Sequence, residues 1–216
     1  MSGAGVSIDR LPDAPPTAVI AGVLVCAHAF TIDRGSARDV RVEVDLRAGL
    51  PALSLIGLPS GSARGVRERV QAAVLNSGYG FPRRRVTVNV APASRGVGSE
   101  LDLAVACCVL AATGEFEPIR LERVGLCAEL SLGGELRQCS NGTAVAQIAE
   151  HAGLAGILVA VADLDQMRLA GGGPVLGRRT LRDVVTLLAG PPGRLEGLLA
   201  AGRREKRPKL APAGTR

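Results

Sequence analysis

Lysine is almost absent from this 216-residue chain. Of its 26 basic side chains only two are lysines, Lys206 and Lys209, and both lie within the last eleven residues. A phosphate-binding P-loop needs a lysine that reaches the terminal phosphates of a nucleotide, and a Ser–Lys dyad or a Schiff base needs one as well. The sequence therefore predicts a folded body, before residue 200, that carries out none of these reactions.

Aromatic residues are scarce too, at 2% of the chain with no tryptophan. Proteins that bind single-stranded nucleic acid by stacking need aromatic platforms, so this mode of binding is disfavoured. Apolar residues nevertheless make up 47% of the chain. That fraction is enough for one sizeable core, built from Val, Leu, Ile and Ala.

Metal and membrane signals are also missing. The five cysteines form no C-x-x-C pair, and only His28 and His151 accompany them, so no zinc-binding spacing occurs. An odd number of scattered cysteines is typical of a reducing compartment. The apolar run 17–30 is too short to span a bilayer and is interpreted as a buried strand or strand pair rather than a signal peptide. We expect a cytoplasmic protein with no metal, cofactor or membrane partner.

Positive charge is concentrated in two zones. Residues 59–99 hold seven arginines against one acid, Glu68, and the tail from residue 201 carries a net charge of +5. Such zones favour an anionic partner, and guanidinium groups fit phosphate well. The alternatives are an arginine-rich composition throughout the chain, a solvated surface, or pairing with acids of a neighbouring subunit. The candidates for sequence-independent nucleic-acid binding are Arg64, Arg67, Arg69, Arg83, Arg84, Arg85 and Arg95.

Hydrophobic periodicity divides the chain into a disordered N-terminus (1–16), a folded domain (17–190), and a Pro/Gly break with a basic tail (191–216). Strands are predicted at 18–26, 39–46, 52–57, 86–90 and 156–161, and a hairpin over 123–138. Helices are predicted over 60–77, 99–113, 141–151, 163–168, 180–188 and 194–201, with Ser60 or Ser62 capping the first and Thr180 the fifth. Because strands and helices do not alternate regularly, the predicted class is α+β, with mixed strands and packed helices.

The Gly-rich segment 94–99 precedes the predicted helix 99–113. The residues of this helix that follow Asp102 carry no charge, so the helix is expected to be central and buried. Ser99 and the acids after it suggest a capping box. Backbone N–H groups at such a turn can bind an anion. Glu100 and Asp102, however, already complement the helix dipole and would repel phosphate, which favours a purely structural turn.

Four phrases carry a resemblance to a known family: VEVDLRAGLPALSLIGLP (42–59), RERVQAAVLNSGYGFPRRRVTVNVAPA (67–93), LDLAVACCVLAATGE (101–115) and AELSLGGELR (128–137). Together they resemble the N-terminal domain of the ComM/YifB family, the magnesium-chelatase-like AAA+ ATPases, over roughly residues 18–190. The resemblance implies a Lon-protease-type α+β fold, followed in the family by an ATPase module. It also implies a link to DNA branch migration during natural transformation, in hexameric rings.

The sequence departs from this family at the positions that carry chemistry. No GxxxxGK[ST] motif occurs in the chain. Where Lon-type proteases place a Ser–Lys dyad, this sequence has Ser99 and Asp102 near the first position and about Thr143 at the second, with no lysine. We therefore predict a non-catalytic interaction module that contacts DNA, a partner ATPase or itself. The alternative is a fragment of an AAA+ ATPase, an ATP-dependent branch-migration helicase, whose catalytic half is absent. A hydrolase that uses Ser99 is disfavoured.

Overall fold

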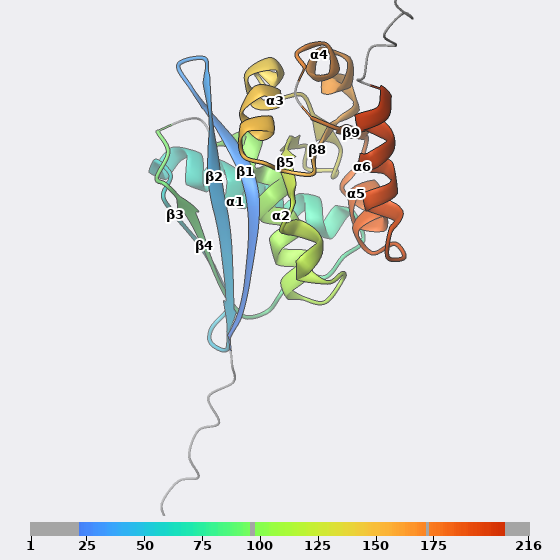
Figure 1. Ribbon diagram of the computed structural model, residues 1–216. Coiled ribbons are helices and arrows are strands. Elements are labelled where there is room, and N and C mark those ends of the chain that lie inside the picture. The colour runs from blue at the N-terminus through green and yellow to red at the C-terminus, as the bar shows by residue number, and fades with distance from the viewer. Residues whose placement is uncertain (1–21, 96–97, 172, 206–216) are drawn as a thin grey trace, which may run out of the picture.

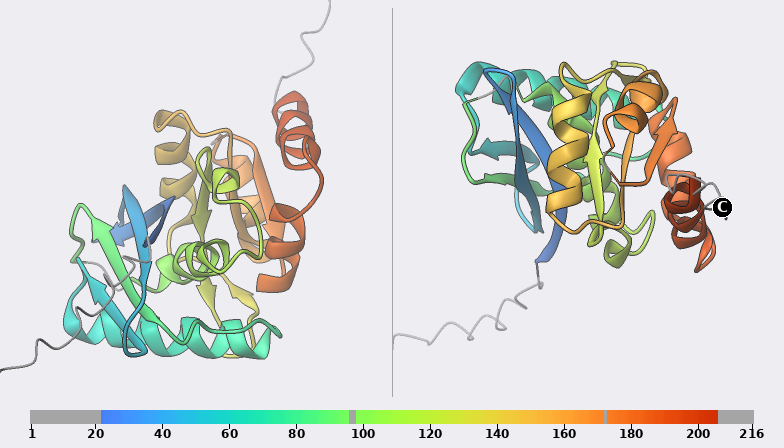
Figure 2. Two further views of the ribbon diagram at one scale, coloured as in Figure 1. Left: turned by 90° about the horizontal axis from the view of Figure 1, so that it is seen from below. Right: turned by 45° about the horizontal axis from the view of Figure 1, so that its top comes forward.

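A seven-stranded mixed sheet organises the structure, a computed structural model that describes residues 22–95, 98–171 and 173–205. The strands lie side by side in the order β3-β4-β2-β1-β5-β8-β9 (Figures 1 and 2). Their bounds are β1 Val23–Asp33, β2 Ser36–Arg47, β3 Ala52–Ile56, β4 Arg85–Ala91, β5 Val124–Cys127, β8 Gly156–Ala160 and β9 Val175–Arg178. A separate hairpin pairs β6 (Glu129–Leu130) with β7 (Leu136–Arg137).

Helices cover both faces of the sheet (Figure 2). One face packs against α1 (Ser60–Asn76), α2 (Asp102–Ala112) and α5 (Leu181–Leu188), and the other against α3 (Gly142–His151) and α4 (Leu164–Leu169). Three 3-10 turns, η1 (Ser99–Leu101), η2 (Pro118–Leu121) and η3 (Val161–Asp163), link these elements. The last helix, α6 (Arg194–Glu205), packs against β9 and buries Leu195 and Leu199 in the same core.

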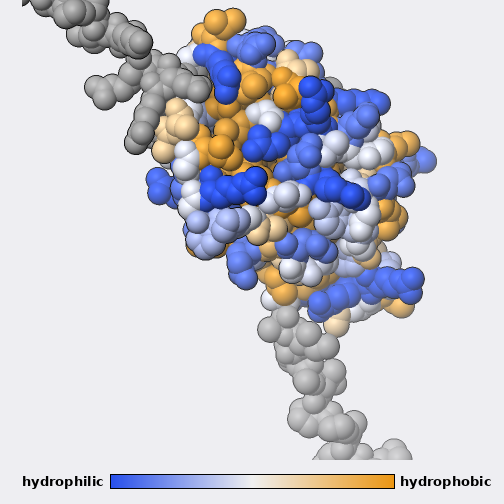
Figure 3. Space-filling view, turned by 90° about the vertical axis from the view of Figure 1, so that its right-hand side faces the viewer, coloured by the Kyte–Doolittle hydropathy of each residue, from blue (hydrophilic) through white to orange (hydrophobic). Residues whose placement is uncertain are grey.

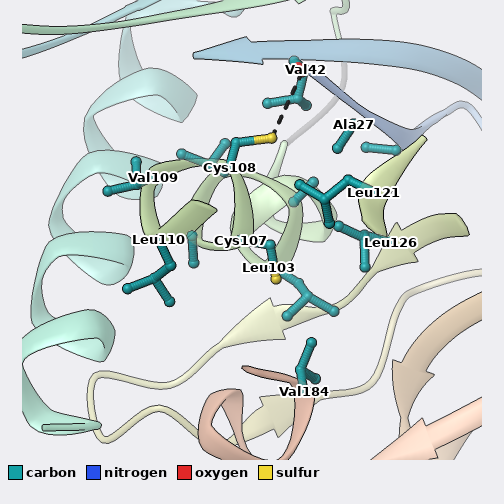
Figure 4. Packing of buried hydrophobic residues seen from close by; sticks show 14 of the residues in the cluster. Ala27, Val42, Leu103, Cys107, Cys108, Val109, Leu110, Leu121, Leu126 and Val184 are labelled. Carbon is teal, nitrogen blue, oxygen red and sulfur yellow. Dashed lines mark hydrogen bonds between the residues drawn. The ribbon is translucent and has the colours of Figure 1, made fainter. Parts of the chain in front are cut away.

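The core forms where the sequence predicted it. On β2, Val40, Val42 and Val44 are buried, while Arg41 between them is exposed. Successive side chains of a strand point to opposite faces, so this alternation directs the valines onto α2. There Cys108 Sγ lies 3.9 Å from the carbonyl oxygen of Val42 (Figure 4). Every residue of α2 up to Ala111 is buried, which confirms the prediction of a central helix.

The predicted hairpin over 123–138 is wrong in its first half. Residues 124–127 form β5, which lies in the middle of the sheet and pairs in parallel with β1 and β8. All four of its residues are buried, as is usual for a parallel strand covered on both faces. Only β6 and β7 form the hairpin. The expected mixture of strands and packed helices is confirmed, but the sheet is mostly parallel, and strands and helices do alternate from β7 to β9.

The β1–β2 hairpin is longer than the sequence indicated. β1 runs to Asp33, beyond the predicted end at residue 26, and pairs with β2 along its whole length. A two-residue turn joins the strands, with φ of 48° at Arg34 and 82° at Gly35. Positive φ at both turn residues matches the right-handed twist of the two strands. The tip of this hairpin projects past the neighbouring strands at the top of Figure 1.

Of the helix caps predicted from the sequence, the one at Thr180 is present in the structure and the others are not. Thr180 caps α5 as predicted, and the structure adds Asp183, which completes a reciprocal capping box. Helix α1 instead begins after Pro59, which makes no side-chain capping bond, so the predicted cap at Ser60 or Ser62 is wrong. The capping box expected at Ser99 is also wrong, because neither η1 nor α2 has a side-chain cap.

Candidate nucleic-acid interface

Helix α1 carries three of the seven candidate arginines, and each has different surroundings. Arg64 is exposed, and its Nε donates to Glu68 Oε1 at 2.9 Å, four residues along the helix. This carboxylate raises the pKa of Arg64. An exposed pair of this kind contributes little to stability and leaves the guanidinium accessible to solvent.

Arg69 points inward and holds a buried carboxylate. Its Nε donates to Asp102 Oδ2 at 2.5 Å and its Nη2 donates to Oδ1 at 3.1 Å. Asp102 is fully buried, and its Oδ2 also accepts from the backbone N–H of Leu130 at 3.1 Å. Burial raises the pKa of Asp102 to about 7, while the Arg69 guanidinium and the Leu130 N–H favour the ionised form. The structure therefore engages Arg69 in an internal pair that ties α1 to α2 and β6.

The third arginine of α1, Arg67, shares a groove with Arg83. The groove has a volume of about 410 Å³ and lies between the start of β3, the middle of α1 and the segment before β4, with Gln71 and Leu75 also in its wall. The Nε of Arg67 is buried and has no hydrogen-bond partner in the part of the chain that the structure describes. A guanidinium N–H without an acceptor is suited to an incoming anion.

The Arg83–Arg85 run lies at the end of the sheet where β4 begins. Arg83 and Arg85 are exposed, and Arg84 is half-buried. Arg85 stands opposite Arg47 of β2 in the strand register, which adds a cation that the sequence analysis did not include. Arg47 is itself paired with Asp45, at 2.6 Å from Nε to Oδ2. This end of the sheet therefore gathers three exposed cations, Arg47, Arg83 and Arg85.

The seventh candidate, Arg95, lies at the other end of β4, away from this group. It lines a cleft of about 780 Å³ between the segment after β4 and the tip of the β1–β2 hairpin. Arg34 and Arg38 of the hairpin line the same cleft. Sequence reasoning missed both, because they lie more than fifty residues from Arg95 and outside the segment of highest charge. The Arg-Gly turn between two alternating segments was the signal that could have found them.

The positions of the Ser–Lys dyad are occupied by residues with other contacts. Ser99 lies in η1, and Asp102 is engaged by Arg69 and Leu130. Thr143 lies in α3, where its Oγ1 accepts from Gln166 Nε2 at 3.3 Å. Glu100, next to Ser99, is buried and accepts the backbone N–H of Ile32 at 2.7 Å through Oε1.

Among the side chains that the structure describes, no three His, Cys, Asp or Glu gather as a metal ion would require. Within the described ranges, no helix has the length and apolar character needed to cross a bilayer. Burial raises the pKa of the Cys107 and Cys108 thiols, which disfavours the reactive thiolate. Hydrophilic and hydrophobic residues are interspersed on the face of α5 and α6 (Figure 3).

Comparison with known protein families identifies the group to which this molecule is related. Residues 42–163, more than half of the chain, match the family described as Subunit ChlI of Mg-chelatase. The chain belongs to the magnesium-chelatase-like ComM/YifB family. The matched segment contains β3, α1, β4 and α2, together with all seven candidate arginines.

Individual ComM/YifB relatives support the assignment. A Mycobacterium tuberculosis protein is 36% identical over 155 residues, and YifB of Escherichia coli is 35% identical over 156 residues. Competence protein ComM of Haemophilus influenzae is 32% identical over 152 residues. These alignments cover 70–72% of this chain but only 30–31% of each relative. The chain thus spans less than a third of the length of these relatives.

Proposed function

We propose that this chain is a non-catalytic interaction module of a ComM/YifB-type protein, with the Lon-protease-type fold of that family, and that it contacts DNA without sequence preference. The observation that carries the proposal is the groove shared by Arg67 and Arg83, with Arg85 exposed beside it. The buried, unpartnered Nε of Arg67, judged over the described residues, supports an anionic occupant. Phosphate contacts of this kind position a protein on nucleic acid but carry no base information.

The proposal extends to the setting in which the module works. The relative named Competence protein ComM supports a role in DNA processing during natural transformation, in the cytoplasm. The partner would be DNA, together with an ATPase module or further copies of the chain. The composition supports a non-catalytic role, because no lysine occurs among the described residues.

The test is fluorescence anisotropy with labelled single- and double-stranded DNA across a salt series. We expect binding that falls steeply with salt, since each neutralised phosphate of duplex DNA contributes a slope of about −0.9 in log K against log salt. The triple variant Arg83→Ala/Arg84→Ala/Arg85→Ala should bind more weakly and have a shallower slope. A matched control, Arg123→Ala/Arg137→Ala/Arg168→Ala, removes three exposed arginines elsewhere on the surface and should bind almost as the wild type does.

A shortened chain separates the folded part from the tail. The cut belongs after Glu205, because a cut at Gly190 would remove α6 and uncover the core at Leu195 and Leu199. Equal loss of binding in the two triple variants, or loss caused only by removing residues 206–216, would contradict the proposed interface.

A second candidate function follows from the relatives' length. Because the alignments cover less than a third of each relative, the second candidate is a fragment of an ATP-dependent branch-migration enzyme whose catalytic half is absent. A reading frame that continues into a GxxxxGK[ST] sequence would favour this alternative.

A further inference from the structure

On the core-facing side of the β1–β2 hairpin, the side chains change from apolar to polar toward the tip. Along β2 the core-facing positions are Val44, Val42 and Val40, and the next two in the row are Arg38 and Ser36, both exposed. Side chains two residues apart share a face, so these polar residues continue the core-facing row past the end of the core. The structure therefore places a polar surface where the apolar pattern stops.

This surface is one wall of the 780 Å³ cleft. The opposite wall is the segment that follows β4, ending at Arg95. Three guanidinium-bearing residues line the cleft, Arg34, Arg38 and Arg95, and no acidic residue is among the described residues that line it. Like charges gathered without a carboxylate repel one another, and an anion between them removes that repulsion.

A buried hydroxyl gives a second, independent sign of a ligand. Thr31 stands opposite Arg38 in the strand register, lines the cleft and is 1% exposed. Its Oγ1 has no hydrogen-bond partner within the part of the chain that the structure describes. A buried hydroxyl without a partner is unfavourable, whereas an acceptor oxygen in the cleft would satisfy it. The neighbouring N–H of Ile32 is by contrast satisfied, by Glu100.

We propose that this cleft is a binding site for a phosphate group, held by Arg34, Arg38 and Arg95 with the Thr31 hydroxyl as a further donor. Phosphate suits the site because it offers several acceptor oxygens and up to two negative charges, which planar guanidinium groups bind in pairs. The cleft has room for a phosphate with its attached group. The phosphate can belong to a nucleic-acid backbone or to a free phosphorylated compound.

The site is distinct from the interface under the proposed function. Arg85 opens β4 and Ala91 closes it, so the two basic groups lie at opposite ends of a seven-residue strand, roughly 20 Å apart at about 3.3 Å per residue. The phosphate site therefore does not depend on the Arg83–Arg85 run, and the two proposals can be tested separately.

The first test is isothermal titration calorimetry of the full chain with pyrophosphate. We expect saturable binding that Arg38→Ala weakens at least about tenfold, as the loss of charged hydrogen bonds predicts. Thr31→Val should also weaken binding without lowering the melting temperature, because it keeps the shape and removes only the hydroxyl. Arg41→Ala is the matched control: it is three residues away on the same strand, exposed, and bound to His28 on the opposite face at 2.8 Å from Nη1 to Nε2.

Absence of pyrophosphate binding, or equal weakening by Arg38→Ala and Arg41→Ala, would overturn the proposal. Unchanged affinity in a folded Thr31→Val variant would remove the hydroxyl from the site and with it the argument for a built pocket.

The second test identifies the source of the phosphate and separates the two interfaces. If Arg38→Ala weakens both pyrophosphate and oligonucleotide binding, the site holds a backbone phosphate. If it weakens only pyrophosphate binding, the site holds a free phosphorylated compound. Loss of DNA binding in the Arg83–Arg85 triple variant alone, with no pyrophosphate binding by the wild type, would retain the proposed function and reject this site. The reverse pattern would retain the site and reject the proposed DNA interface.

Discussion

Arg69 and Arg38 have the same side chain in opposite surroundings. At the α1–α2 contact, Arg69 meets the buried carboxylate of Asp102 and forms two hydrogen bonds with it. In the cleft at the hairpin tip, Arg38 has two more arginines as its neighbours and no acid among the lining residues that the structure describes. The first arginine is required by the fold, whereas the second is available to a ligand. Counting cations along the sequence treats the two alike.

The largest expected effect is on the first of these regions. Arg69→Ala leaves Asp102 buried without its partner and should lower the free energy of unfolding by about 3–5 kcal/mol. Urea denaturation of the wild type and the variant measures this difference. Arg64→Ala on the same helix is the control and should leave the midpoint unchanged, because its pair with Glu68 is exposed. Similar midpoints for Arg69→Ala and the wild type would show that the fold does not require Arg69, contrary to the contrast with Arg38.

The next prediction concerns the pH dependence of stability. In the native state the pKa of Asp102 is raised to about 7 by burial, whereas an unfolded aspartate titrates near about 3.9. Between these values the native state binds more protons than the unfolded state, so the contribution of Asp102 to stability falls as pH rises from about 4 to 7.

Replacing the carboxylate of Asp102 tests whether its contribution to stability falls as pH rises. Asp102→Asn should flatten the fall of unfolding free energy between about pH 4 and 7, measured by urea denaturation at several pH values. An unchanged slope would show that Arg69 holds the carboxylate ionised throughout that range.

The smallest expected effect belongs to the second region. Thr31→Val removes a buried hydroxyl that has no partner among the described atoms, and should raise the free energy of unfolding by about 1 kcal/mol in phosphate-free buffer. Thermal melting with and without pyrophosphate measures the effect. The wild type should gain stability from the ligand and the variant should gain less. A destabilised variant would mean that the hydroxyl already has a role in the fold.

Local patterns predicted much of the fold. The alternation over 40–46 placed β2, the uncharged run after Asp102 placed α2, and Thr180 marked the start of α5. Each of these signals lies within a few residues of the element that it predicts. Residues 124–127 were misplaced because a short apolar run has the same pattern in a hairpin and in a buried parallel strand.

The candidate site was only partly predictable, because its geometry depends on contacts far apart in the chain. The residues near Arg69 in the sequence do not predict its partner Asp102, which lies 33 residues away. Arg34 and Arg38 meet Arg95 only because β4 pairs with β2 and returns the chain to the hairpin tip. The exposed Arg83 and Arg85 were found because three consecutive arginines are visible without a fold.

The pair of Arg69 and Asp102 also constrains how this sequence can change over generations. Substituting either partner leaves the other buried without its hydrogen bonds, so each single substitution is destabilising. Replacing both with apolar residues of similar size can restore stability. We therefore expect related sequences to keep both charges or to lack both, since a sequence with only one of them would fold less stably.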